Sequence, residues 1–168
     1  GFVMPMAIDF AVWVALRPRA DQEVRAYSLD YPDHPAEFSL TDIPHPHKQW
    51  TEYVTGVAHM LQTAGHTLKG WDGVVVGDVP RGAGLSSSAA IELAIARAFA
   101  HISGIKWDKR EMALLCQRVE NEWVGKKSGI MDQMISASGE KGYALKIDCR
   151  DLSTELVPLP EGLSVVIL

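Results

Sequence analysis

The amino-acid sequence predicts one domain of mixed α and β structure, and three observations support this fold class. The chain has 168 residues, the length of a single ordinary domain. Hydrophobic residues make up 47% of the chain and charged residues 22%, a balance typical of a packed globular core. Segments in which apolar residues alternate are followed by segments in which they recur at helical spacing.

The first forty or so residues are predicted to form mainly β-strands. Apolar and polar residues alternate over residues 7–17, with Val14 and Leu16 on one side and Trp13 on the other, which is typical of a half-buried strand. Residues 22–29 follow a turn and are expected to pair back on this strand in antiparallel fashion. The pattern also indicates short strands at residues 1–4 and 37–40.

The rest of the chain is predicted to combine helices with further strands. The expected helices cover residues 48–64, 89–103, 109–124 and 129–139, and the expected strands cover residues 74–79, 143–149, 154–159 and 163–168. Gly65 and Gly104 are placed to end the first two helices, and Asp108 with Glu111 forms a capping box for the third. The helix over 89–103 is apolar on nearly every face, so we expect it to lie at the centre of the domain. Trp50 is predicted to be part of the core.

The stretch between the strand over 74–79 and the alanine-rich helix carries the strongest functional signal. It reads Pro-Arg-Gly-Ala-Gly-Leu-Ser-Ser-Ser-Ala and covers residues 80–89. Glycines let a backbone approach a ligand closely, and a helix N-terminus presents N–H groups and a dipole that favour an anion. Serine hydroxyls can bind phosphate oxygens or complete the coordination of Mg²⁺. The pattern indicates a nucleoside triphosphate site, although on spacing alone a serine-capped helix after a glycine turn explains it equally well.

Several other classes of protein are disfavoured. A Walker A loop needs a lysine after its second glycine, and none follows Gly84. A serine hydrolase using Ser87 would need a nucleophile elbow, but Ser88 stands where its second glycine belongs. The formal charge of −5 without a basic cluster argues against nucleic-acid binding. No apolar run is long enough to cross a membrane, Cys116 and Cys149 are too few for a disulfide framework, and no obligate protein partner is indicated. We therefore expect a cytoplasmic protein.

Four stretches in register resemble the GHMP small-molecule kinases, in the form that galactokinases carry. Residues 80–89 resemble the ATP-binding signature of this family. The other similar stretches are GFVMPMAID at 1–9, VENEWVG at 119–125, and GIMDQMISASG at 129–139, which is followed by ALKIDCR. The resemblance implies an α+β fold, the GHMP kinase N-terminal domain, which is similar to domain 2 of ribosomal protein S5. In this fold a mixed sheet is covered by helices on one side.

The resemblance also implies roles for individual residues. ATP is expected to contact Arg81, Gly82, Ala83, Gly84, Leu85, Ser86, Ser87 and Ser88. Ser88 and Glu120 are expected to coordinate Mg²⁺. Asp132 is expected to be the catalytic residue beside the sugar hydroxyl, and Gly129 to let the sugar approach the backbone. From spacing alone, Glu120 would be an exposed glutamate near a helix C-terminus, and Asp132 would make only a favourable contact with a helix dipole.

The activity implied by the resemblance is ATP-dependent phosphorylation of the anomeric hydroxyl of galactose. A related kinase of N-acetylgalactosamine or another sugar, and a galactokinase-like regulator without catalysis, remain alternatives. In the family, the residues that bind the sugar include a motif upstream of the position of Gly1. We therefore expect residues 1–168 to be an N-terminal domain truncated at both ends, without the C-terminal GHMP domain and inactive alone. Lys126 and Lys127 are interpreted as solvated charges, with nucleotide or sugar contacts left open.

Overall fold

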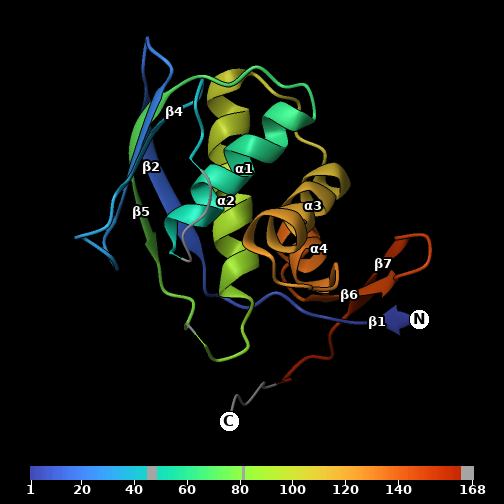
Figure 1. Ribbon diagram of the computed structural model, residues 1–168. Coiled ribbons are helices and arrows are strands. Elements are labelled where there is room, and N and C mark those ends of the chain that lie inside the picture. Colours follow the sequence, from blue (N-terminus) through green and yellow to red (C-terminus); the bar gives the residue numbers. More distant parts are fainter. Residues whose placement is uncertain (45–48, 81, 164–168) are drawn as a thin grey trace.

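The structure is a computed structural model that describes residues 1–44, 49–80 and 82–163. Its strands are β1 (Phe2–Val3), β2 (Val12–Pro18), β3 (Glu23–Ser28), β4 (Ala36–Ser39), β5 (Trp71–Gly77), β6 (Tyr143–Asp148) and β7 (Thr154–Pro158). Its helices are α1 (Thr51–Thr63), α2 (Ser87–Ser103), α3 (Lys109–Arg118), the π-helical segment η1 (Val119–Val124) that continues α3, and α4 (Met131–Ser138). These elements form a four-stranded sheet, a layer of helices and a smaller three-stranded sheet (Figure 1).

The larger sheet has the strand order β2-β5-β3-β4 and is mixed. Strand β5 pairs antiparallel with β2 and parallel with β3. The predicted antiparallel pairing of residues 22–29 with the strand before them is therefore wrong, because β5 lies between the two. Glycines allow β5 to fit there: a Cβ at Gly73 would lie 2.7 Å from the carbonyl oxygen of Ala15, and one at Gly70 would clash with the backbone of Glu23.

Helices α1 and α2 cover one face of this sheet, whereas its other face is open to solvent (Figure 1). The fully buried side chains between sheet and helices include Val24, Val54, Val57, Ala58, Leu61, Trp71, Ile95, Ala96 and Phe99. On the open face Trp13 and Tyr27 are 52% and 43% exposed. The predicted α+β fold, with helices packed on one side of a mixed sheet, is confirmed.

Most predicted helix boundaries are confirmed. Helix α2 ends at Gly104, whose φ of 70° lies in the left-handed region that ends many helices. The Asp108 side chain accepts a hydrogen bond from the backbone N–H of Glu111 at 2.9 Å and so caps α3. Trp50 precedes α1 and is only 8% exposed, as expected for a core residue. The strand predicted over residues 7–17 is shorter in the structure, where it begins at Val12 as β2.

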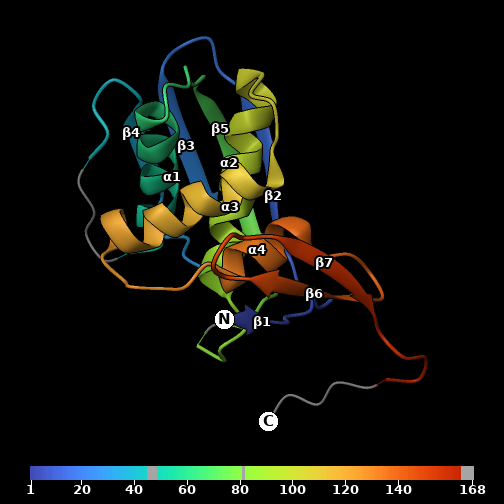
Figure 2. The same cartoon turned by 90° about the vertical axis from the view of Figure 1, so that its right-hand side faces the viewer.

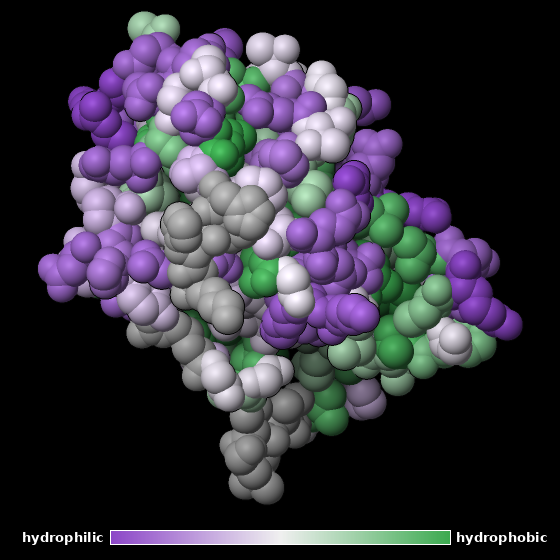
Figure 3. All heavy atoms as spheres, in the orientation of Figure 1, coloured by the Kyte–Doolittle hydropathy of each residue, from purple (hydrophilic) through white to green (hydrophobic). Residues whose placement is uncertain are grey.

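The smaller sheet has the order β1-β6-β7 and packs against α4 (Figure 2). Its buried residues Leu145 and Ile147 join Ile130, Met134 and Ile135 in a second core. Apolar surface gathers over this sheet in the space-filling view, whereas the surface over α3 is mostly hydrophilic (Figure 3). A strand was predicted over residues 163–168. In the structure Leu163 belongs to no strand, and residues 164–168 lie outside the described residues. No helix in the described part of the chain is long and apolar enough to cross a membrane.

Candidate functional site

The loop that leads into α2 has the backbone geometry of a glycine-rich anion loop. Gly82 and Gly84 have φ angles of 73° and 71°, in the left-handed region that favours glycine. Among the described residues, no atom lies within 4 Å of a Cβ added at either position, so the backbone conformation, rather than lack of room, requires glycine. Ser86, directly before the helix, also has a positive φ of 57°. Arg81, another predicted ATP contact, lies outside the described residues.

The start of α2 leaves helical N–H groups available for a ligand. Within the described residues, the side chain of Ser86 makes no capping hydrogen bond to the helix. The first N–H groups of a helix lack intrahelical partners, and their dipoles favour negative charge. The remaining predicted ATP contacts follow one another through this turn and into the helix: Gly82, Ala83, Gly84, Leu85, Ser86, Ser87 and Ser88. Their arrangement can bind an anionic group such as phosphate.

A cavity of about 820 Å³ adjoins this helix start. Ser87 and Ser88 line part of it, and its other walls come from β5, the start of α1, the segment after β3, and single residues of β2 and η1. The α1 side includes Tyr53 and Trp50, and the indole N–H of Trp50 donates a hydrogen bond to the carbonyl oxygen of His34 at 2.7 Å. Cavities of several hundred cubic ångströms with apolar and aromatic walls are typical small-molecule sites. This one is large enough for a nucleoside.

Glu120 is buried beneath the helix layer, with a relative exposure of 2%. The expectation from spacing alone, an exposed glutamate, is therefore wrong. Helical spacing itself allows this burial, because Glu120 follows the fully buried Cys116 by one helical turn, close to where the π-helical segment η1 begins at Val119. Segment η1 also packs closely on α1: a Cβ at Gly56 would lie 2.7 Å from Cγ1 of Val119 and 2.8 Å from Cδ1 of Trp123.

The surroundings of Glu120 keep its carboxylate charged. Burial, the largest single influence, would raise the pKa of Glu120, and hydrogen bonding with the Ser128 and Ser88 side chains acts in the opposite direction. The ammonium of Lys126, 3.5 Å from Oε1, and the amide of Gln133 lower the pKa of Glu120 further, so the net shift is downward. Ser88 and Glu120, the two predicted metal ligands, thus lie close enough for the serine to lower the pKa of the carboxyl, although they come from different helices. The Lys126 side chain is 64% exposed, in line with its interpretation as a solvated charge, but its ammonium also pairs with the buried Glu120.

A buried amide connects Glu120 to a second glutamate. Nε2 of Gln133 donates hydrogen bonds to Oε2 of Glu120 at 3.2 Å and to Oε2 of Glu92 at 3.3 Å. Both Gln133 and Glu92 have no exposed surface. Burial, followed by the nearby charge of Glu120, raises the pKa of Glu92 to about 9. At neutral pH the Gln133 amide therefore lies between the charged carboxylate of Glu120 and the neutral carboxylic acid of Glu92.

Asp132 and Gly129 lie on the same side of the domain as this cluster. Asp132 is half-buried in the first turn of α4, and its charge contributes to the raised pKa of Glu92. A chain of contacts and neighbouring residues therefore runs from Ser88 through Glu120 and Gln133 to Asp132. Gly129 lies in the exposed loop before α4, where a Cβ would meet nothing within 4 Å and the φ angle does not demand glycine. The described residues of the protein do not themselves require a glycine there.

Side-chain amides hold the loop that carries Gly129. The backbone N–H of Ser128 donates to Oδ1 of Asn121 at 2.8 Å, and Nε2 of Gln117 donates to the carbonyl oxygen of Ser128 at 3.2 Å. These hydrogen bonds fix the loop on α3 and η1. Sequence reasoning missed these anchors, because isolated Asn and Gln residues carry no distinctive pattern.

Sequence reasoning also missed Glu92 and Gln133. One signal was present: Glu92 stands within a helix that is otherwise apolar on nearly every face. A charged residue in such a helix is buried and needs a polar partner. Nothing in the sequence identifies Gln133 as that partner, since it lies 41 positions further along the chain.

The donor set around Ser88 and Glu120 fits Mg²⁺ bound together with a phosphate ligand. Mg²⁺ prefers hard oxygen ligands and is usually held by one or two carboxylates, substrate phosphates and water. A hydroxyl and an ionised carboxylate satisfy this pattern. Among the residues that the structure describes, no cluster of three or more His, Cys, Asp or Glu side chains could hold a metal by itself.

Relatives of known identity place these features in a family. The family model for the GHMP kinases N terminal domain matches residues 52–140. The galactokinase of Roseiflexus sp. (strain RS-1) is 48% identical over 167 residues, which cover 99% of this chain but only 42% of that protein. The chain thus spans less than half the length of this relative.

Solved structures agree with this assignment. The crystal structure of Lactococcus lactis galactokinase complexed with galactose superposes with a TM-score of 0.90 at 34% identity, covering 94% of this chain and 42% of that one. The Methanococcus jannaschii mevalonate kinase matches with a TM-score of 0.73 at 20% identity over 90% of this chain and 47% of its own, a likeness of fold alone. The chain therefore belongs to the GHMP kinases, and residues 52–140 lie in the N-terminal domain that defines the family.

Proposed function

We propose that residues 1–168 form the ATP-binding domain of a sugar kinase that phosphorylates the anomeric hydroxyl of galactose. The identity to the Roseiflexus galactokinase and the superposition on the galactose complex of the Lactococcus enzyme support this activity. The observation that carries the proposal is the cluster around Glu120, which lies near Ser88 and accepts a hydrogen bond from Gln133, the residue next to Asp132. This cluster brings the helix start at which we propose that ATP binds close to the carboxylate of Asp132 on another helix. Phosphoryl transfer requires the two substrates to be held side by side.

ATP binds at the start of α2 in this proposal. The left-handed Gly82 and Gly84 direct the loop backbone around the helix end, and the free N–H groups of the first turn donate hydrogen bonds to the triphosphate. The nucleoside occupies the adjoining cavity between β5 and α1. Mg²⁺, held by Ser88 and Glu120 together with the phosphates, supplies positive charge that stabilises the transferred phosphoryl group.

Asp132 acts on the acceptor. Phosphoryl transfer asks a protein mainly to position the reactants and to stabilise spread negative charge. The anomeric oxygen forms a bond to the γ-phosphorus, the bond to the leaving ADP breaks, and the hydroxyl loses its proton. The Asp132 carboxylate orients this hydroxyl or accepts its proton. The absence of a side chain at Gly129 lets the sugar lie close to the loop. We also propose a cytoplasmic enzyme, with Cys116 and Cys149 as free thiols.

The test is formation of ADP by the full-length gene product with a panel of sugars. ATP and Mg²⁺ are supplied with galactose, N-acetylgalactosamine or glucose, and the sugar 1-phosphate is identified. We expect turnover with galactose that disappears when Mg²⁺ is chelated. Preferential turnover of N-acetylgalactosamine would assign a related sugar kinase instead. Binding of galactose and ATP without any ADP formation would replace the kinase by a non-catalytic regulator.

A further inference from the structure

The side chain of Gln133 joins the two halves of the candidate site. It directly follows Asp132 in the first turn of α4, and its Nε2 donates to Glu120 of η1 and Glu92 of α2. Glu92 lies one helical turn after Ser88 on the same helix. One amide therefore connects the three helical segments that carry Ser88, Glu120 and Asp132.

The chemistry of its neighbours determines the orientation of this amide. The ionised carboxylate of Glu120 has only acceptor oxygens, so the amide nitrogen of Gln133 must face Glu120, and the same nitrogen lies 3.3 Å from Oε2 of the neutral Glu92. Both N–H bonds of Nε2 are then used. A hydrogen bond to a charged group is stronger than one between neutral groups, so the bond to Glu120 restrains that carboxylate most.

The same side chain is poorly suited to a purely structural role. Oε1 of Gln133 is buried, as is Oε1 of Glu92, and within the described residues neither accepts a hydrogen bond. Leaving Oε1 of Gln133 unsatisfied costs stability, and an apolar side chain of the same length would remove that cost at position 133, although Oε2 of Glu92 would then lose its hydrogen bond from Gln133. The feature that an apolar side chain would lack is the pair of hydrogen bonds from Nε2.

We propose that Gln133 is a positioning residue that holds the Glu120 carboxylate in the orientation needed to bind Mg²⁺ and fixes it relative to Asp132. This inference rests on the proposed function, since it assigns Glu120 to the metal. Groups that hydrogen-bond to metal ligands orient them, and losing one typically lowers metal affinity or activity by about 10- to 100-fold. Gln133 touches neither substrate in this proposal and acts through Glu120.

The test compares Gln133→Met with Glu120→Gln and with the double variant in the full-length protein. Methionine keeps the length of the side chain and removes the amide. The affinity for a non-hydrolysable ATP analogue is measured by calorimetry with Mg²⁺ and with EDTA, and kcat and KM are measured for galactose. Gln62→Met is the matched control, because it removes an amide that donates to the carbonyl oxygen of Leu40 at 2.9 Å, away from the site.

We expect Gln133→Met to weaken binding of the analogue by about 10- to 100-fold in Mg²⁺ and to leave binding in EDTA unchanged. Its kcat should fall while KM for galactose stays close to wild type. The double variant should bind Mg²⁺ and the analogue no more weakly than Glu120→Gln alone, because both changes disable the same ligand. Gln62→Met should behave like wild type. If Gln133→Met does not fold, Gln133→Asn replaces it, since its amide is one methylene shorter.

Two other outcomes are distinguishable. Equal losses with Mg²⁺ and with EDTA, or losses that add in the double variant, would overturn the role of Gln133 while leaving the kinase proposal intact. A wild-type protein that binds no Mg²⁺–nucleotide would overturn the proposed function, and the role of Gln133 with it.

Discussion

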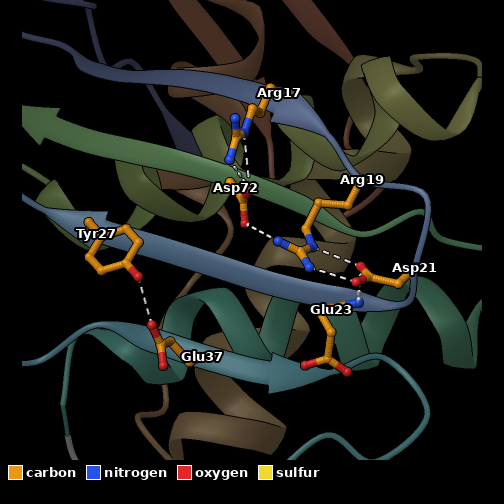
Figure 4. Close-up of polar contacts among 7 residues, drawn as sticks. All are labelled: Arg17, Arg19, Asp21, Glu23, Tyr27, Glu37 and Asp72. Atoms are coloured by element: carbon orange, nitrogen blue, oxygen red, sulfur yellow. Dashed lines mark hydrogen bonds and ion pairs between the residues drawn. The ribbon is translucent and has the colours of Figure 1, made fainter.

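Charged side chains occur in two contrasting settings in this domain, the open face of the larger sheet and the interior beneath the start of α2. On the open face Arg17, Arg19, Asp21 and Asp72 form a row of ion pairs in which Asp72 bridges the two arginines at 2.8–2.9 Å (Figure 4). In the interior, Glu92, Gln133 and Glu120 share hydrogen bonds without an arginine. Both settings contain carboxylates, but those of the first lie on the open face, whereas Glu92 and Glu120 are buried.

The two settings shift carboxylate pKa values in opposite directions. Hydrogen bonds from Arg19 lower the pKa of Asp21 to about 2, whereas burial raises that of Glu92 to about 9. Exposed pairs gain little stability because solvent screens them and long side chains lose entropy in pairing. A buried acid, by contrast, depends on every neighbouring polar group. We therefore expect substitutions near the interior cluster to have large effects and those on the open face to have small ones.

The largest effect on turnover is expected at Asp132, which is half-buried at the edge of the interior cluster. Asp132→Asn keeps the size of the side chain but removes its charge and its basicity. Since a group that orients or deprotonates the acceptor typically contributes about 10²- to 10⁴-fold, kcat of the full-length enzyme should fall by that range. The measurement is steady-state turnover with saturating ATP and galactose. Near-normal turnover would remove Asp132 from the mechanism.

A moderate effect is expected at Gly129. Neither its backbone conformation nor a lack of room requires glycine, so Gly129→Ala should leave the thermal midpoint unchanged. An added methyl group should nevertheless obstruct the sugar and raise KM for galactose by roughly tenfold. Gly142→Ala is the contrasting control, because its φ of 83° makes any side chain strained there and stability should fall. An unchanged KM in Gly129→Ala would separate the sugar from this loop.

A pH-dependent effect on stability is expected for Glu92→Gln. Unfolded Glu92 ionises near its ordinary pKa of 4.5, whereas folded Glu92 keeps its proton up to about 9. Wild-type stability should therefore decline as the pH rises through this interval, and a glutamine, which does not titrate, avoids the decline. Between about pH 5 and pH 8 the free energy of unfolding of Glu92→Gln should gain up to about 1.4 kcal/mol per pH unit relative to wild type.

Denaturant unfolding across this pH range measures the difference. A constant difference between the two proteins at all pH values would mean that Glu92 is already ionised in the folded state. The amide of Gln133 would then lie between two charges, and the contrast with the open face would weaken.

The smallest effect is expected on the open face. Asp72→Asn removes the carboxylate that pairs with Arg17 and Arg19, of which the Arg17 side chain is 81% exposed and that of Arg19 20% exposed, while an asparagine keeps the size and hydrogen-bonding capacity of the side chain. The thermal midpoint should change by no more than about 2 °C, and the change should shrink further at high salt. A larger loss that persists in high salt would show that these surface charges contribute as much as the buried ones.

Local patterns predicted many of the elements and part of the site. The glycine at position 104 and the capping box at Asp108 and Glu111 placed helix ends correctly, because each acts on backbone groups a few residues away. The glycine-rich loop and Asp132 were identified from contiguous motifs. The position of β5 between β2 and β3 was not predictable, because pairing between distant strands depends on how well whole strands fit together.

The sequence by itself determined the fold class and the left-handed glycine turn before α2, and it supplied the proposal that Asp132 acts on the acceptor. These features depend on short stretches of chain whose residue types act locally. Tertiary structure alone decided that Glu120 is buried and charged, that Glu92 is buried and neutral, and that Gln133 joins them. The physical reason is that burial and hydrogen-bond partners set a pKa, and both come from helices that lie far apart in the sequence.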